Sequence, residues 1–153
     1  MNNQLASLRP SGAFIGAAWA SLVIGVLAYL IGLWNSQMLL NEKGYYFAIL
    51  ILGLFAAISL QKTVRDKAEG IPVTGTYTGV CWVGLAMSLL LLVVGLFNAT
   101  FDFAVKGFFG MAYLFSLFAV VTVQKNVRDA NMFSESAGES KTVELESRGD
   151  VAE

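Results

Sequence analysis

The stretch LVIGVLAYLIGLW, residues 22–34, decides the fold because it is apolar around the whole circumference of a helix. A helix at the surface of a soluble bundle carries a polar stripe that faces water. The stretch LLLLVVGLF, residues 89–97, is also apolar all round. These two stretches therefore favour helices surrounded by lipid over the alternative of a soluble four-helix bundle.

The composition of the 153-residue chain supports a membrane location. Hydrophobic residues make up 56% and charged residues 14%, against roughly 45–50% and about 25% in soluble proteins. A transmembrane helix needs about 17–25 mostly apolar residues. Four runs qualify, the second and fourth near the lower limit: Ala13–Trp34, Gly44–Leu60, Tyr77–Phe97 and Gly107–Val123. We therefore predict an all-α polytopic membrane protein with four transmembrane helices and, from the pattern of the first dozen residues, no cleaved signal peptide.

A charged hexapeptide follows the second run and recurs after the fourth. It reads QKTVRD at 61–66 and QKNVRD at 124–129, a separation of 63 positions (124 − 61) that also relates Asn35 to Asn98 and Lys43 to Lys106. The chain is thus a tandem duplication of one helical hairpin, residues 11–66 and 74–129. Because each copy crosses the membrane twice, the two form a parallel repeat about an axis along the membrane normal. The short turns predict that the two helices of each hairpin pack as antiparallel neighbours.

The distribution of Lys and Arg predicts the orientation. Six flank the spans on one side and two on the other; the first group is Arg9, Lys62, Arg65, Lys67, Lys125 and Arg128, and the second is Lys43 and Lys106. The positive-inside rule then places both termini in the cytoplasm. Residues 1–10, the linker 67–73 and the acidic tail 130–153 are expected there as well, and the tail is expected to be disordered because it cannot bury a core.

The repeated hexapeptide supplies the charged residues that we consider as a site: Lys62, Arg65, Asp66, Lys125, Arg128 and Asp129. The first interpretation is anchoring, because Lys and Arg at a helix C-terminus complement the helix dipole and reach the lipid headgroups. Asp66 could also pair with Lys62 four residues earlier. A third interpretation is a lock between the repeats, in which Arg65 pairs with Asp129 and Arg128 with Asp66. A basic rim of this kind could also recognise anionic lipids.

Two further sets of residues repeat at the helix ends. Asn35 and Asn98 follow apolar runs, where Asn ends helices in the left-handed conformation; the alternative is a polar site shared with Lys43 and Lys106. Next to these lysines, Tyr45, Tyr46, Phe108 and Phe109 are expected to form an aromatic belt at the headgroups. Gly12 and Gly16, repeated as Gly75 and Gly79, have the GxxxG spacing of helix packing, which could also dimerise the protein.

The sequence offers little chemistry. Histidine is absent, and the single Cys81 lies in an apolar run, where a thiol behaves as a small hydrophobe. We find no nucleophile beside a base, metal cluster, phosphate-binding loop or cofactor motif, so we predict no enzyme activity, no cofactor and no nucleic-acid binding. The polar residues that we identify in the spans are Ser21, Tyr29, Ser59, Ser88 and Thr122.

Two functions remain open from the residues. The first is a structural or interaction protein whose partners are membrane lipids and either itself or another membrane protein. It follows from the lack of charged residues inside the spans, because ion and proton pathways normally have them. The alternative is a small transporter or channel subunit that forms a pore by oligomerisation. Asn35, Asn98, Lys43 and Lys106 would then select the solute.

The two copies, GLWNSQMLLNEKGYYFAILILGLFAAISLQKTVRD (32–66) and GLFNATFDFAVKGFFGMAYLFSLFAVVTVQKNVRD (95–129), resemble the YiaA/YiaB family of bacterial inner-membrane proteins. The linker EGIPVTGTY (69–77) is similar to that of the YiaA-like form, which has two tandem two-helix units. The resemblance covers residues 11–129. It implies the fold, an inner-membrane location and a Gram-negative host. It implies no catalytic or binding residue, because the family has no established molecular function.

Overall fold

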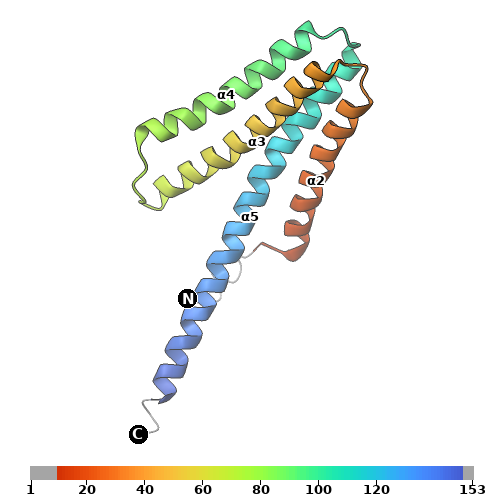
Figure 1. Ribbon diagram of the computed structural model, residues 1–153. Coiled ribbons are helices and arrows are strands. Elements are labelled where there is room, and N and C mark those ends of the chain that lie inside the picture. Colours follow the sequence, from red (N-terminus) through yellow and green to blue (C-terminus); the bar gives the residue numbers. More distant parts are fainter. Residues whose placement is uncertain (1–9, 150–153) are drawn as a thin grey trace.

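The computed structural model describes residues 10–149, with side chains as far as Met132. Its helices are α2 (Gly12–Asn35), α3 (Leu40–Ala68), α4 (Gly75–Asn98) and α5 (Phe103–Gly149) (Figure 1). Within this part of the chain, four helical segments are long and apolar enough to cross a membrane. The 24 residues of α2 span about 36 Å at about 1.5 Å each, more than the hydrocarbon layer of about 30 Å. The predicted all-helical architecture with four spans is confirmed.

The two repeats begin with the same helix cap. The Ser11 hydroxyl accepts a hydrogen bond from the Phe14 N–H at 3.2 Å, and the Thr74 hydroxyl accepts one from the Tyr77 N–H at 3.4 Å. Ser and Thr are favoured at this position because they satisfy a free N–H of the first turn. Since 74 − 11 is 63, the cap is part of the duplicated unit.

The linker begins at a left-handed glycine. Gly70 has φ of 74°, and its N–H donates to the Lys67 carbonyl at 3.2 Å while the Ile71 N–H donates to the Asp66 carbonyl at 2.8 Å. These two bonds form a Schellman motif, which satisfies the last carbonyls of α3. The helix runs to Ala68, so the linker is the segment 69–74, slightly later than the predicted 67–73.

The packing of the helices differs from the predicted pair of compact hairpins. The most extensive contacts are α2 with α5 and α3 with α4, followed by α3 with α5, whereas the helices within each hairpin touch only slightly. Figure 1 shows α3 with α4 as one inclined pair, and α2 beside α5. Each hairpin is therefore open, and its helices pack mainly against helices of the other repeat. The structure therefore does not confirm the prediction that the two helices of each hairpin pack as antiparallel neighbours.

Glycines explain why the packing crosses between repeats. A Cβ atom on Gly25 would lie 2.9 Å from Phe115 Cδ1 and from Ser116 Oγ, and one on Gly32 would lie 2.5 Å from Phe108 Cε1. Tyr113 fills the space beside Gly53, and Tyr45 and Tyr46 pack on Gly95. These four glycines all face the other repeat. In lipid, helices associate where small residues let backbones approach closely, so these positions select the interlocked arrangement.

An aromatic cluster fills the core near the turns 36–39 and 99–102, which we name the turn end. Tyr46 and Phe109 occupy the same position in the two repeats, and their rings stack with centroids 5.9 Å apart. They are only 4% and 1% exposed, whereas their neighbours Tyr45 and Phe108 are 37% and 43% exposed. The predicted aromatic belt is therefore half right. Consecutive helical residues point in different directions, so only one ring of each pair faces outward.

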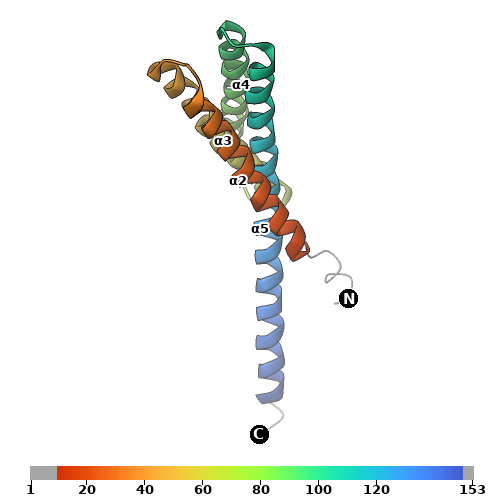
Figure 2. The same ribbon diagram turned by 90° about the vertical axis from the view of Figure 1, so that its right-hand side faces the viewer.

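The predicted disordered tail is helical over most of its length. Helix α5 continues without a break to Gly149, well beyond the other three helices (Figures 1 and 2). Residues 130–149 contain no proline, and four of them are Glu, a good helix former. They extend an existing helix, so they bear no nucleation cost. Residues 150–153, like 1–9, lie outside the described residues.

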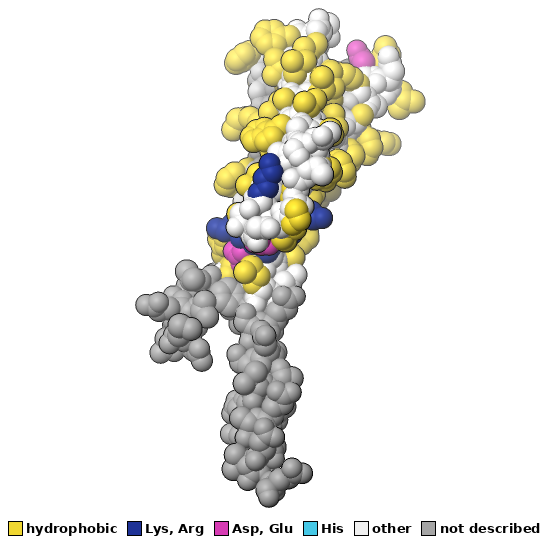
Figure 3. Space-filling model, turned by 90° about the vertical axis from the view of Figure 1, so that its left-hand side faces the viewer, with side chains coloured by type: hydrophobic (Ala, Val, Ile, Leu, Met, Phe, Trp, Pro, Cys, Tyr) yellow, Lys and Arg dark blue, Asp and Glu magenta, His cyan; other side chains and the backbone are white. Residues whose placement is uncertain are grey.

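The outer surface of the bundle is apolar. Large side chains such as Ile24, Ile31, Phe55, Trp82 and Phe118 are half or more exposed. Figure 3 shows apolar side chains over most of the face in view, with Lys and Arg gathered at its lower part. This is the surface that a lipid bilayer covers.

We predict that Gly53→Val destabilises the protein by about 1–3 kcal/mol, because the added methyl groups would overlap Tyr113. Thermal melting in detergent measures the effect. Gly107→Val is the matched control, since a Cβ there would meet no atom within 4 Å. Equal melting temperatures for the two variants would contradict the close contact between α3 and α5.

Candidate functional site

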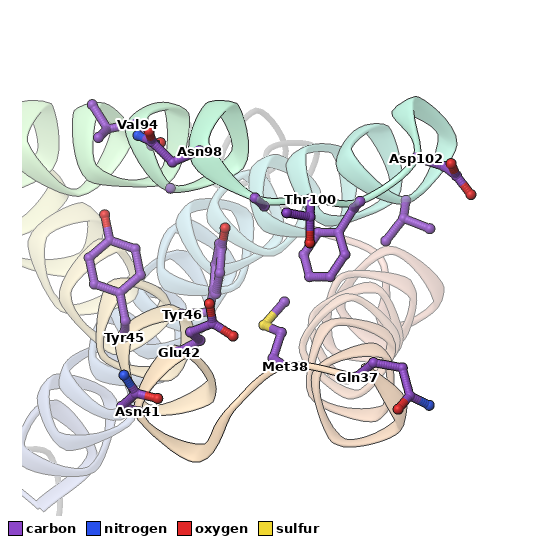
Figure 4. A pocket seen from close by; sticks show the side chains of 14 residues that line it. Gln37, Met38, Asn41, Glu42, Tyr45, Tyr46, Val94, Asn98, Thr100 and Asp102 are labelled. Atoms are coloured by element: carbon purple, nitrogen blue, oxygen red, sulfur yellow. The ribbon is translucent and has the colours of Figure 1, made fainter.

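A cavity of about 700 Å³ opens at the turn end, between the two repeats (Figure 4). Its volume lies in the range of about 300–1,000 Å³ that is typical of small-molecule sites. Residues of both outer turns and of α3 and α4 form its walls. Among them are Met38, Glu42, Tyr45, Tyr46, Asn98, Thr100, Phe101 and Asp102.

The floor of this turn-end cavity is aromatic and its rim is polar. Phe101 stacks on the buried Phe109 with centroids 6.1 Å apart, beside Tyr46. At the rim, a Glu42 carboxylate oxygen accepts a hydrogen bond from the Leu39 N–H at 2.8 Å, while Asp102 points away from the centre (Figure 4). Among the described residues, no Lys or Arg lines this cavity. This lining suits an amphipathic molecule that is neutral or cationic.

The four polar residues predicted for the outer turns form two equivalent helix caps. The Asn35 amide donates to the Ile31 carbonyl and the Asn98 amide to the Val94 carbonyl, both at 2.8 Å. The Lys43 ammonium donates to the Trp34 carbonyl at 2.9 Å, and the Lys106 ammonium to the Phe97 carbonyl at 3.5 Å. A cation at a helix C-terminus offsets the partial negative charge there.

This arrangement corrects two interpretations. The Asn residues end their helices through side-chain bonds to the preceding turn, and among the described residues only glycine has positive φ, so the left-handed mechanism is wrong. The four residues are also divided between two separate turns. Only Asn98 lines the turn-end cavity, so the alternative of one site shared by all four is not formed.

The acidic residues of the repeated hexapeptide pair within their own motif. Arg65 Nη2 lies 2.6 Å from Asp66 Oδ1, and Arg128 Nη2 lies 2.8 Å from Asp129 Oδ1. Neither the cross-repeat ion pairs nor the pair of Lys62 with Asp66 is formed in the part of the chain whose side chains are described. Anchoring by Lys62, Arg65, Lys125 and Arg128 stays a prediction.

The predicted packing glycines are not used within the monomer. A Cβ on Gly12, Gly16, Gly75 or Gly79 would meet no atom within 4 Å. The glycines that do pack are Gly25, Gly32, Gly53 and Gly95. Of these, Gly32 and Gly95 could have been found from their equivalent places in the repeated GL(W/F)N motif, whereas Gly25 and Gly53 align with Ser88 and Ser116 and carry no repeated glycine signal.

Two buried polar residues were missed in the spans. Ser116 donates to the Ala112 carbonyl at 2.7 Å. The Tyr113 hydroxyl lies near Ser88 but has no partner of hydrogen-bond geometry among the described residues. Of the polar residues that we did identify, Tyr29 donates to the Tyr46 carbonyl at 3.1 Å, which ties α2 to α3. Of these three groups, Tyr29 is the one that joins two helices by a hydrogen bond.

The described residues offer little reactive chemistry. No group of three or more His, Cys, Asp or Glu side chains among them could hold a metal ion. Cys81 is buried, with its sulfur 3.8 Å from Thr63 Oγ1 on α3. Its place between α4 and α3 fits the interpretation of a small packing residue.

Comparison with known proteins follows the duplication. The family model described as the yiaA/B two helix domain matches residues 14–66 and again residues 77–129. The chain is 54% identical to the inner membrane protein YiaA of Escherichia coli strain K12 over 132 residues, which cover 86% of this chain and 90% of that protein. No solved structure matches the chain.

Two shorter similarities concern other members of the group. The uncharacterized membrane protein YubF of Bacillus subtilis strain 168 is 47% identical over 62 residues, 40% of this chain and 71% of that protein. The inner membrane protein YiaB of Escherichia coli strain K12 is 29% identical over 96 residues, 63% of this chain and 81% of that protein.

Proposed function

The chain belongs to the yiaA/B two-helix domain family, and we propose that it is a non-enzymatic structural protein that associates with a second copy of itself in the membrane. It is a multi-pass inner-membrane protein, as its four apolar helices and its inner-membrane relative indicate. None of the names of its three relatives states an enzyme activity.

The open GxxxG faces carry the proposal of self-association. Gly12 and Gly16 on α2, and Gly75 and Gly79 on α4, are exposed and meet no side chain within 4 Å. In contrast, the space beside Gly25, Gly32, Gly53 and Gly95 is filled by residues of the other repeat. Apolar side chains alone gain little by association in lipid, so an open small-residue face is the surface that gains most from a partner helix.

A second copy is the partner that fits these faces best. The duplication places the same spacing on α2 and on α4, near the first turn of each helix. Association of like faces around a two-fold axis is the commonest arrangement of homo-oligomers. Both contacting faces then come from copies of this chain, so the proposal requires no other protein.

The orientation of the protein is part of the proposal. We infer that both termini are cytoplasmic, because Lys62, Arg65, Lys125 and Arg128 all lie at the same end of the helices as the linker 69–74, and the turn end carries only Lys43 and Lys106. This end, which we name the linker end, would then face the cytoplasm.

Substitution of the open glycines tests self-association. We expect Gly16→Ile with Gly79→Ile to weaken association by about tenfold, or about 1.4 kcal/mol, because bulky side chains prevent close approach of the helices. Energy transfer between labelled copies in vesicles measures it. Gly16→Ala with Gly79→Ala should change association little. Unchanged energy transfer in the isoleucine variant would refute the proposed surface.

Reporter fusions test the orientation. A phosphatase that works only outside the cytoplasm should stay inactive when fused after Glu153 and become active when fused in the turn 99–102. The positive-inside charge asymmetry is the physical reason. Activity after Glu153 would contradict the assignment.

The turn-end cavity favours a second candidate function, uptake of a small amphipathic solute by an assembled transporter. In one copy the cavity is closed below by the packed rings of Tyr46 and Phe109, so a pathway would require assembly. Asn98→Leu should then reduce flux into proteoliposomes, while Asn35→Leu should not, because both cap their helices but only Asn98 lines the cavity. Equal flux in both variants would count against this function.

A further inference from the structure

The two QKxVRD motifs meet at the linker end, around a second cavity of about 140 Å³. It lies between α3 and α5. Three side chains from each repeat line it at equivalent positions, together with Ile58: Gln61, Lys62 and Arg65, then Gln124, Lys125 and Arg128. Each pair is separated by 63 residues, for example 125 − 62. The cavity therefore lies across the axis that relates the two repeats.

The cavity carries surplus positive charge. Asp66 and Asp129 each bind the adjacent arginine, at 2.6 and 2.8 Å, and Glu69 lies 3.8 Å from Arg65. These carboxylates hold the guanidinium groups in place and do not line the cavity. Lys62 and Lys125, in contrast, make no hydrogen bond or ion pair with the residues that the structure describes. Their charges are left without a partner among the described residues.

We propose that this cavity binds a phosphate group, with Lys62 and Lys125 as its main charge partners. The lining offers ammonium, guanidinium and amide N–H donors from two sides, and phosphate oxygens accept bonds of this kind strongly. A volume of about 140 Å³ equals that of about four to five water molecules at about 30 Å³ each. This is enough for one phosphate group.

The duplication itself supports the site. A ligand on the axis between two repeats is contacted by each repeat in the same way. Each repeat must therefore carry the same hydrogen-bond donors. The residue between Lys and Val differs, as Thr63 and Asn126, and both side chains are buried away from the cavity. The six polar residues that line the cavity are identical in the two motifs.

The phosphate could belong to a lipid headgroup or to a soluble molecule. The cavity lies at the ends of two membrane spans, the depth at which headgroups are found. Under the proposed orientation this is the cytoplasmic leaflet, where anionic lipids attract basic groups. The proposal does not depend on self-association, because one copy supplies the whole cavity.

Binding to the full chain in detergent tests the proposal with two probes. In the first experiment, the melting temperature is measured as inorganic phosphate is added. In the second, the protein is exposed to vesicles of phosphatidylglycerol with phosphatidylcholine or to vesicles of phosphatidylcholine alone, and native mass spectrometry measures the lipid that it retains. We expect Lys62→Gln with Lys125→Gln to weaken binding by at least about tenfold. Lys62→Arg with Lys125→Arg should keep most of it. Lys67→Gln, a cation at the same end that does not line the cavity, is the matched control.

The outcomes separate the two sources. Retention of phosphatidylglycerol that is lost only in the double Gln variant supports a headgroup site, and stabilisation by inorganic phosphate with no lipid preference supports a soluble ligand. Binding that is equal in wild type and the double Gln variant, or lost equally in Lys67→Gln, would overturn the proposal. So would the absence of binding to either probe. Melting of both double variants shows whether the substitutions leave the fold intact.

Discussion

The structure depends on the close contact of α5 with glycines of the first repeat. In a bilayer, each helix satisfies its own backbone hydrogen bonds, and apolar side chains gain little by leaving lipid for another helix. Packing at close range therefore decides which helices pair. Helix α5 packs closely on both α3 and α2: Tyr113 lies over Gly53, and Phe115 and Ser116 lie against Gly25. The helix that precedes α5 in its own hairpin offers no comparable fit in the described structure.

This constraint turns a duplicated hairpin into one interlocked unit. The helices α3 and α5, which are equivalent in the two repeats, contact each other, while α4 packs on α3 and α2 packs on α5. Their equivalent residues then meet in pairs. Tyr46 stacks on Phe109 at the turn end, and the QKxVRD motifs face each other at the linker end. One two-helix unit alone would leave both packing faces without a partner.

The sequence predicted the four helices and the repeat because these rest on local features: apolar runs and a 63-residue offset. It did not predict which helices pair. Gly25 contacts Ser116 and Gly53 contacts Tyr113 only in the folded protein, so no local pattern marks these pairs. The GxxxG spacing indicated other glycines, which are open in the monomer. The sequence did not predict the turn-end cavity, although Asn98, which lines it, was among the candidate site residues. The aromatic floor was missed because its residues resemble a lipid-facing belt in sequence.

The most direct test of the interlocked arrangement joins α2 to α5 covalently. In a variant with Cys81 replaced by Ser, Gly25→Cys and Ser116→Cys are combined with a protease site inserted in the linker 69–74. After oxidation and cleavage, the account predicts that the two halves stay joined at the mass of one chain, 16.5 kDa, and separate on reduction. A control with Gly12→Cys in place of Gly25→Cys should separate without reduction. Separation of the Gly25→Cys halves under oxidising conditions would contradict the account.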